Sequence, residues 1–294
     1  MRETKTYKVV GYVVLVIVTL ILVYPVFNMV MLAFMPNDEI NSIPLPFFPS
    51  RFTWDNFKHI ISAFGYYEED GVTHSYVGQF FSNTLYVIVL NAVGMTISST
   101  MCAYGFSKLK FAGRDLTFGI LMATIMLPSA VTMIPLFTLF RDFGWLDTLH
   151  PITIPNFFGG GVMTIFLLRQ YMKTLPDTLM EAARIDGASA FRVYWNIVLP
   201  NCKPIIFYNF LGVISSAWSD WFTPYLYINS KEKWTVPLAV ANMAQSAKSY
   251  EVGSLGAKGV QIATGLVLCI VPLITYILGQ KHYVDNVTLT GVKG

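Results

Sequence analysis

The amino-acid sequence predicts an all-α, polytopic membrane protein with six transmembrane helices. Of its 294 residues, 54% are hydrophobic and only 13% are charged, a composition too apolar for an ordinary soluble domain. The apolar residues gather in six segments near the length, roughly 20 residues, that an α-helix needs to cross the bilayer core. The polar residues gather between these segments, so the chain is expected to cross the membrane six times.

The six apolar segments are residues 9–35, 79–106, 116–140, 152–172, 204–228 and 260–278. The first is much longer than the apolar region of a signal peptide and lacks a small-residue cleavage site, so we interpret it as an uncleaved span. Pro128 and Pro135 interrupt the third segment, and three consecutive glycines at 159–161 interrupt the fourth. Such breaks either line a pathway or serve close helix packing.

The distribution of basic residues predicts the orientation in the membrane. If the N-terminal Arg2, Lys5 and Lys8 are cytoplasmic, 13 of the 20 lysines and arginines fall on the cytoplasmic side. Cytoplasmic loops of membrane proteins carry an excess of these residues. Both termini and the loop between the fourth and fifth segments are therefore expected in the cytoplasm.

That loop, residues 177–203, has the pattern of a helix, a break and a second helix. Pro176 and Asp177 suit a first helical turn, because proline tolerates the missing donor there and a carboxylate favours the positive end of the helix dipole. Gly187 can end the helix in a left-handed conformation. The small and apolar residues before it would let one side of the helix press against another protein.

Ser189 can cap the second helix of the loop. Apolar residues along it recur at helical spacing and are expected to form one face, at Phe191, Tyr194 or Trp195, and Val198. Pro200 is expected to end this helix. On periodicity alone, a connecting loop that happens to be helical explains these residues as well as a functional element does.

The loop also carries an extended motif: Glu-Ala-Ala, three residues, Gly, nine residues, then Ile-x-Leu-Pro. Its residues are Glu181, Ala182, Ala183, Gly187, Ile197, Leu199 and Pro200, with Asp186 and Ala188 beside the glycine. This motif resembles the coupling loop of the permease subunits of bacterial ATP-binding-cassette (ABC) importers. Together with the C-terminal residues 289–294, it is most similar to the carbohydrate-uptake branch of that superfamily, the maltose-type permeases.

The resemblance implies a type I ABC importer permease, and it implies which residues couple it to an ATPase. The coupling residues would be Glu181, Ala182, Ala183, Asp186, Gly187 and Ala188. The chain would have three parts: a first helix with its outer loop (1–78), a five-helix core (79–280) and a cytoplasmic tail (281–294). The tail would either reach toward the ATPases or fray as a free terminus.

The resemblance also implies partners in the bacterial inner membrane. These are a second, homologous permease, two cytoplasmic ATPase subunits and an extracytoplasmic solute-binding protein. The sequence contains no G-x-x-x-x-G-K-[ST] phosphate loop, so ATP and Mg²⁺ are expected on the ATPase subunits. This chain is expected to be no enzyme and to hold no cofactor or metal, and its modest charge of +3 gives no support for nucleic-acid binding.

Four residues of the fifth segment are candidates for the solute path. Trp218, Trp221 and Tyr225 lie at spacings of three and four, which would put them on one helical face suited to sugar rings. Asn209, the fourth candidate, lies nine residues before Trp218 in the same segment. The alternative for the tryptophans is an aromatic belt at the membrane interface, and Asp220 between them is expected at that interface as well.

The longest polar segment, residues 36–78, contains Pro44, Pro46 and Pro49, which favour extended structure, and Thr53, a candidate cap for a short helix. This helix would carry aromatic and aliphatic residues between Trp54 and Phe64. Two interpretations are equally supported. The segment is a docking ledge for an extracytoplasmic partner, or it lies on the lipid headgroups.

The expected function is an importer permease for an oligosaccharide or a sugar-like solute, driven by ATP hydrolysis on partner subunits. A permease for another solute, such as glycerol phosphate, is the nearest alternative. An ion-coupled secondary transporter normally has ionisable residues near the membrane centre. The central parts of the predicted spans contain almost none, so this alternative is disfavoured. A membrane enzyme is disfavoured because the four histidines and three cysteines are scattered.

Overall fold

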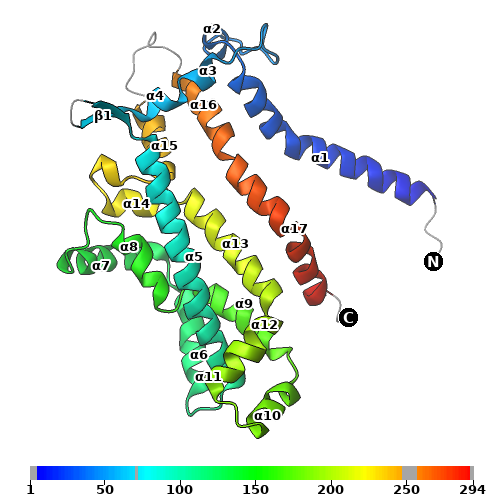
Figure 1. The fold of residues 1–294 in the computed structure, drawn as a ribbon. Helices are drawn as coiled ribbons and strands as arrows, with labels where there is room; N and C mark the ends of the chain where they lie inside the picture. Colours follow the sequence, from blue (N-terminus) through cyan, green and yellow to red (C-terminus); the bar gives the residue numbers. More distant parts are fainter. Residues whose placement is uncertain (1–4, 70–71, 247–256, 292–294) are drawn as a thin grey trace. The chain divides into compact units, whose positions relative to one another are not determined.

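The structure, a computed structural model, describes the backbone of residues 5–69, 72–246 and 257–291 (Figure 1). The chain divides into two compact units. Met1–Val77 and Val240–Ile270 make up the first unit, and Gly78–Ala239 and Val271–Gly294 make up the second. Residues 240–270 thus group with the N-terminal part of the chain, whereas the predicted division keeps them with residues 79–280.

The first unit is built on two apolar helices that pack on each other, α1 (Lys5–Ala33) and α16 (Ala257–Leu268). α1 is long because residues 9–35 contain no charged side chain to interrupt it, and Pro25 lies inside it. Three short helices also contact α16: α2 (Asn37–Ile40), α3 (Asp55–Lys58) and α4 (Ile60–Phe64). Two antiparallel strands follow, β1 (Tyr66–Glu69) and β2 (Val72–Ser75), and they are the only strands in the described part of the chain.

The helix predicted after Thr53 is present but divided. The Thr53 hydroxyl accepts a hydrogen bond from the Asp55 amide at 3.1 Å, but the N-cap residue of α3 is Trp54, so the predicted cap lies one residue too early. His59 then separates α3 from α4, so the apolar residues of this region lie on two short helices.

Asn56 ties the start of this region to the end of α1. Its side chain is fully buried, and its amide nitrogen donates to the carbonyls of Ala33 and Met35 at 3.0 and 2.9 Å. Gly259 of α16 lies so close that a Cβ atom there would overlap with the Asn56 amide oxygen. α16 therefore needs a glycine at this position to pack on α3.

The second unit contains the remaining helices. In chain order these are α5 (Val77–Lys108), α6 (Arg114–Ala123), η1 (Thr124–Met126), α7 (Ser129–Asp142), α8 (His150–Thr153), η2 (Ile154–Phe157), α9 (Val162–Lys173), α10 (Asp177–Ile185), α11 (Ala190–Val193), η3 (Tyr194–Val198), α12 (Leu199–Asn201), α13 (Lys203–Ser219), α14 (Phe222–Tyr227), η4 (Lys231–Lys233), α15 (Val236–Ser246), which continues into the first unit, and α17 (Ile270–Gly291). η3 is a π-helical turn, and the other η elements are 3₁₀ turns.

Among the described residues, four helices are long and apolar enough to cross a membrane, and up to six segments qualify if each of two bent helix pairs counts as one span. One pair, Arg114–Met126 and Ser129–Asp142, bends by 100°, and Pro128 begins its second helix as the N-cap. Pro135 lies inside α7 without breaking it. The predicted glycine break is confirmed, because residues 158–161 separate η2 from α9.

The fifth predicted span, residues 204–228, is wrong as a single helix. α13 ends at Ser219, and a new helix, α14, begins at Phe222. The Asp220 carboxylate accepts a hydrogen bond from the Thr223 amide at 3.0 Å, so it caps the first turn of α14 and satisfies a backbone donor that the break exposes. Hydropathy alone does not reveal this break, because the residues on both sides of it are apolar.

Two hydrophobic clusters form the core of the second unit. One joins the end of α5 to α9, α10 and the π-helical turn, and its fully buried members include Leu168, Met172, Val193 and Val198. The other joins the middle of α5 to α7, α8 and α14 through Val87, Phe140, Ile152 and Tyr227. The first cluster supports the loop that carries the Glu-Ala-Ala motif.

Candidate functional site

α10 is the short amphipathic helix that the motif predicts. Pro176 is its N-cap residue, Asp177 lies in its first turn, and Arg184 lies in its last turn, where a positive charge favours the negative end of the helix dipole. Gly187 ends the helix with a left-handed φ of 80°. The predicted limits of this helix are therefore confirmed.

The six predicted coupling residues divide between two faces. Ala183 and Ala188 pack against the core cluster beside the buried Met180. The other four, Glu181, Ala182, Asp186 and Gly187, are exposed. Ile185, between them, is 87% exposed, which is unusual for a large aliphatic side chain. The exposed surface thus combines the carboxylate of Glu181 with the apolar side chain of Ile185, a combination suited to binding a protein partner.

The second helix of the loop also begins as predicted. The Ser189 hydroxyl accepts a hydrogen bond from the Arg192 amide at 3.3 Å, and the chain then runs through α11, η3 and α12 to Asn201, one residue beyond Pro200.

The apolar face predicted for this second helix is only partly right. Val193, Tyr194 and Val198 are buried, whereas Phe191 and Trp195 are 63% and 60% exposed and stack on each other with ring centroids 6.3 Å apart. The π-helical turn at 194–198 inserts an extra residue per turn, so α-helical spacing misassigns the faces on either side of it. Phe191 and Trp195 enlarge the exposed surface of the loop.

Lys108, at the end of α5, anchors α10 to the bundle. Its side chain is only 4% exposed, and its ammonium group donates to the Leu175 carbonyl and to the Asp177 carboxylate, both at 2.7 Å. This hydrogen bond and the charge of Lys108 hold the pKa of Asp177 below its usual value. The sequence alone does not reveal the role of Lys108, because its position beside α10 depends on the tertiary fold.

Two further contacts join α5 to the second helix of the loop. The Tyr104 hydroxyl donates to the Ala190 carbonyl at 3.0 Å, and the hydroxyls of Thr100 and Tyr194 lie 2.8 Å apart. α5 therefore forms hydrogen bonds with both helices of the loop.

Arg169, on α9, is a buried cation that sequence reasoning missed. Its Nε atom donates to the Phe106 carbonyl at 3.2 Å, its guanidinium carbon lies 3.8 Å from the centre of the Phe118 ring, and a terminal nitrogen lies 3.9 Å from the Asp115 carboxylate. Arginine suits this position because its planar group stacks on a ring while it donates at the edges. It ties α5 and α6 to α9, the helix that leads into α10.

The three aromatic solute-path residues, which are predicted to share one helical face, lie on two different helices. Asn209 and Trp218 lie on α13, whereas Trp221 is the N-cap residue of α14 and Tyr225 lies within it. The Asn209 amide donates to the Ile205 carbonyl of its own helix at 2.8 Å. The Trp218 ring lies beside Phe81 of α5 at 6.0 Å, and Trp221 lies beside Tyr225 at 6.2 Å. A role in solute contact stays a prediction, but a continuous helical face cannot be its basis.

The glycine break between η2 and α9 packs on the middle of α5. Asn156 donates to the Asn91 side chain at 2.9 Å, and its carbonyl accepts from Ser98 at 2.9 Å. Gly160 has a left-handed φ of 56° and lies against Ser99 and Met95 of α5. These contacts satisfy polar groups of an irregular segment inside a predicted span, where unpaired groups are costly.

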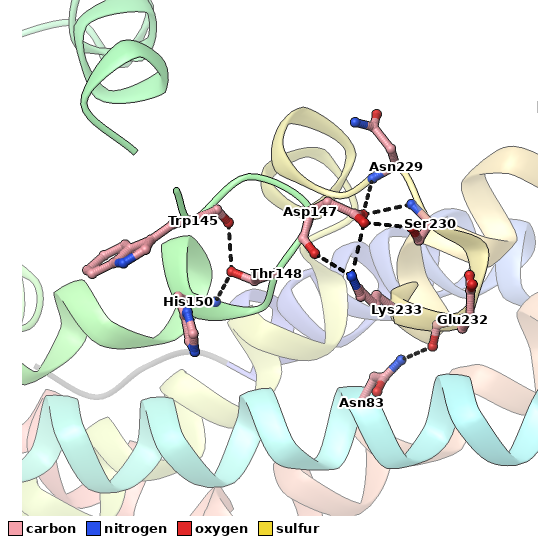
Figure 2. A network of polar contacts seen from close by, with 9 residues as sticks. All are labelled: Asn83, Trp145, Asp147, Thr148, His150, Asn229, Ser230, Glu232 and Lys233. Atoms are coloured by element: carbon pink, nitrogen blue, oxygen red, sulfur yellow. Dashed lines mark hydrogen bonds and ion pairs between the residues drawn. The ribbon is translucent and has the colours of Figure 1, made fainter. Parts of the chain in front are cut away.

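A second polar network, shown in Figure 2, joins the turn after α7 to the turn after α14. One carboxylate oxygen of Asp147 accepts from the amides of Asn229 and Ser230 at 3.0 and 2.8 Å, and the other accepts from the Ser230 hydroxyl at 2.6 Å and the Lys233 ammonium at 3.0 Å. Partial burial acts to raise the pKa of Asp147, but these donors outweigh it and hold the pKa far below its usual value.

α5 joins this second network from the side. The Asn83 amide donates to the carbonyls of Glu232 and Trp234 at 2.8 and 3.0 Å. The network therefore holds three segments together at the end of α13 away from α10. Among the described side chains, no three His, Cys, Asp or Glu residues are grouped to bind a metal ion.

Comparisons with known proteins show what this chain is similar to. The model of the family described as "Binding-protein-dependent transport system inner membrane component" matches residues 94–285. The chain is 27% identical, over 94% of its length and 93% of the relative, to the arabinooligosaccharides transport system permease protein AraQ of Halalkalibacterium halodurans. It is 26% identical to the galactooligosaccharides permease protein GanQ of Bacillus subtilis (97% and 95% covered) and to the sn-glycerol-3-phosphate permease protein UgpE of Yersinia enterocolitica (92% and 92%).

Two solved structures have the same fold. The first is a chain of a bacterial ABC transporter involved in the import of the acidic polysaccharide alginate, with a TM-score of 0.78, 22% identity, and 96% and 98% of the two chains covered. The second is a chain of a bacterial alginate ABC transporter in complex with an alginate pentasaccharide-bound periplasmic protein, with a TM-score of 0.65, 14% identity, and 93% and 92% covered. The predicted fold class, a multi-pass type I ABC importer permease, is confirmed.

Proposed function

We propose, from the premise that this chain belongs to the family of binding-protein-dependent transport system inner membrane components, that it is a permease subunit of an ATP-driven oligosaccharide importer. Two of the relatives are permeases for arabinooligosaccharides and galactooligosaccharides, and two structural neighbours belong to alginate importers. A glycerol phosphate importer is the second candidate, because one relative of similar identity is named for that solute.

The observation that carries the proposal is the exposed face of α10. This helix is fixed on one side by Met180 in the core and by Lys108 at its first turn, and it presents Glu181 and Ile185 on the other side. Because one side of α10 is fixed to the helix bundle and the other side is exposed, α10 can bind a partner protein and transmit the movement of that partner to the bundle. Closure of two ATPase subunits around ATP would move α10 and, through α5, shift the spans between inward-open and outward-open states.

The proposed function implies three kinds of partner. Two cytoplasmic ATPase subunits would hold ATP and Mg²⁺, a second permease would complete the membrane passage, and a solute-binding protein would deliver the oligosaccharide. Both termini and α10 would then face the cytoplasm of a bacterial cell, as the excess of basic residues on that side also indicates.

The function is tested by solute uptake into vesicles that contain the full complex. Each oligosaccharide class and glycerol phosphate is supplied with its binding protein, and uptake is measured with and without internal ATP. ATP-dependent uptake of an oligosaccharide supports the proposal. Uptake that needs an ion gradient and no ATP would identify a secondary transporter, and uptake of glycerol phosphate alone would select the second candidate.

The orientation predicts which single cysteines a membrane-impermeant reagent reaches. Thr178 on α10 and Glu232 in η4 are both exposed, so a cysteine at either position can react where the reagent has access. In intact cells, Glu232→Cys is expected to be labelled from outside and Thr178→Cys only after the membrane is opened. Labelling of both from outside contradicts the orientation.

Reversing the charge of Glu181 is expected to weaken ATPase binding. A charge-assisted hydrogen bond is worth about 1.5–3 kcal/mol, so Glu181→Lys would lower the association constant roughly ten- to a hundredfold. The measurement is the affinity of the purified permease pair for its ATPase subunits. Asp142→Lys is the matched control, because Asp142 is an exposed acid at the end of α7, and equal losses in the two variants would remove Glu181 from the interface.

A further inference from the structure

Residues 43–49, Ile-Pro-Leu-Pro-Phe-Phe-Pro, form an apolar loop without helix or strand in the first unit. Its side chains are unusually open for their type: Ile43 is 98% exposed, and Leu45, Phe47 and Phe48 are 47% to 59% exposed. The loop contains no charged residue. A soluble protein rarely leaves so many neighbouring apolar side chains uncovered, so something outside this chain is expected to cover them.

Hydrogen bonds give the loop a defined, closed shape. The Glu39 carboxylate accepts hydrogen bonds from the Ser50 amide, at 3.0 Å, and from the Ser50 hydroxyl. These contacts close the two ends of the loop on each other, so residues 43–49 project together as one surface.

Ring contacts place this surface against a particular part of α1. Phe47 stacks on Tyr24 with centroids 6.1 Å apart and planes at 17°, and Phe48 meets Phe27 edge-on at 6.1 Å. The side chains of residues 8–26 of α1 are all exposed, and none of the residues in the most apolar 18-residue window of the Lys8–Ala33 span is buried by the rest of the described chain. The loop therefore continues an apolar surface that faces lipid.

The length of α1 indicates how deep in the membrane the contact between α1 and the loop lies. Lys8 marks one membrane boundary, because a lysine at the end of a span extends its charge to the interface. At about 1.5 Å per residue, a hydrocarbon core of about 30 Å is crossed in roughly 20 residues. The opposite boundary therefore falls near Tyr24 and Phe27, the two residues that meet the loop, and aromatic rings are enriched at this depth.

The three prolines of the loop make its irregular backbone compatible with the membrane boundary, because they reduce the number of amide donors. Irregular backbone near lipid is costly because its amide donors lack partners. Pro44, Pro46 and Pro49 remove three of the seven donors of the loop. At headgroup level, water and lipid oxygens remain available for the other four.

We propose that residues 43–49 are a membrane-interface loop that inserts its apolar side chains among the lipid headgroups beside the end of α1. The partner is the lipid surface. The position of Phe47 against a lipid-facing helix, and the absence of charge in the loop, argue against a soluble protein as its partner. The assignment does not depend on which side of the membrane this end of α1 faces.

Spin labels on the complete transport complex test this assignment. Cys102 and Cys269 are replaced by alanine, and the fully buried Cys202 is kept. Single labels are placed at Ile43 or Leu45, at Ile17 in the middle of α1, and at Thr73 on β2, which is exposed. The complex is reconstituted in phosphatidylethanolamine and phosphatidylglycerol vesicles, and collisions with oxygen and with a water-soluble nickel chelate are compared.

The expected oxygen-to-nickel collision ratio at Ile43 and Leu45 is several-fold above that at Thr73 and below that at Ile17. A ratio equal to that at Thr73 would mean that the loop lies in water and would overturn the assignment. Protection from both reagents would indicate a second protein chain, and protection only after the solute-binding protein is added would indicate a docking ledge. Either result also rejects the lipid surface as the partner.

Discussion

Replacing Lys108 with methionine is expected to lower the amount of solute transported per ATP hydrolysed by about tenfold. Methionine fills the apolar space of the lysine stem, but it removes the hydrogen bond to the Leu175 carbonyl and the ion pair with Asp177. A hydrogen bond from a charged group contributes about 1.5–3 kcal/mol, and tenfold corresponds to about 1.4 kcal/mol. The exposed face of α10 is unchanged, so the ATPase subunits still bind and hydrolyse ATP.

The matched control for this prediction is Lys110→Met. Lys110 is two residues away and exposed, and none of the hydrogen bonds described for α10 involves it. Purified complexes of both variants are reconstituted, and uptake and ATP hydrolysis are measured on the same vesicles. An unchanged ratio in Lys108→Met would show that α10 keeps its position without the anchor.

The ion pair also predicts how coupling depends on pH. The folded-state pKa of Asp177 is lowered, so its stabilising contribution is present above the ordinary aspartate value, about 3.9, and is lost only as the pH falls through the lower folded value. Transport per ATP is therefore expected to be constant between about pH 6 and 8 as far as this pair is concerned.

Asp177→Asn should have a smaller effect than Lys108→Met on the amount of solute transported per ATP, because Lys108 still reaches the Leu175 carbonyl.

Gly160→Val is expected to destabilise the second unit and to lower the melting temperature of the complex. The left-handed backbone at this position strains a branched side chain by about 1–2 kcal/mol. A Cβ atom would also overlap with the Ser99 hydroxyl and lie 2.8 Å from the Met95 side chain, and overpacking of this kind costs about 1–3 kcal/mol. Together these costs remove a large part of the stability of a typical domain, about 5–15 kcal/mol.

Two alanine variants separate the causes. Gly105→Ala on α5 meets no atom within 4 Å and has no left-handed backbone, so it should behave like the parent. Gly159→Ala has a left-handed φ of 113° but open space, so it reports backbone strain alone. The measurement is the melting temperature of the purified complex, together with the amount of full-length chain in the membrane. A parental melting temperature for Gly160→Val would mean that the break does not pack on α5.

Local signals in the sequence predict where helices start and stop, and most of these predictions are confirmed. Pro128, the glycines at 159–161, Gly187 and Ser189 all occupy the breaks and caps expected of them. These residues act through their own backbone, so their effect can be inferred without a fold. The direction in which the chain leaves a break, such as the 100° bend before α7, depends on packing and cannot be inferred in this way.

The candidate site is less predictable because its residues act across the fold. The motif locates α10 and four exposed residues on it or directly after it. Lys108 lies 69 residues before Asp177 in sequence, and its contact with Asp177 forms only in the folded chain. The contacts of Arg169 with α5 and α6 likewise depend on the fold. Two failures have local causes. The π-helical turn shifts the faces around Trp195, and the cap at Asp220 ends a helix inside an apolar stretch.

The exposure of α1 has a consequence for biosynthesis. This helix has a mean hydropathy of 2.7 over its most apolar window and needs no other described part of the chain to bury it, so the insertion machinery can release it into lipid as soon as it is made. The pair of α6 and α7 is bent by 100° at its break, and backbone groups that a break leaves without helical partners need neighbouring helices before they can leave water. During synthesis, α1 therefore holds the nascent chain at the membrane until the later spans have been made and can assemble together.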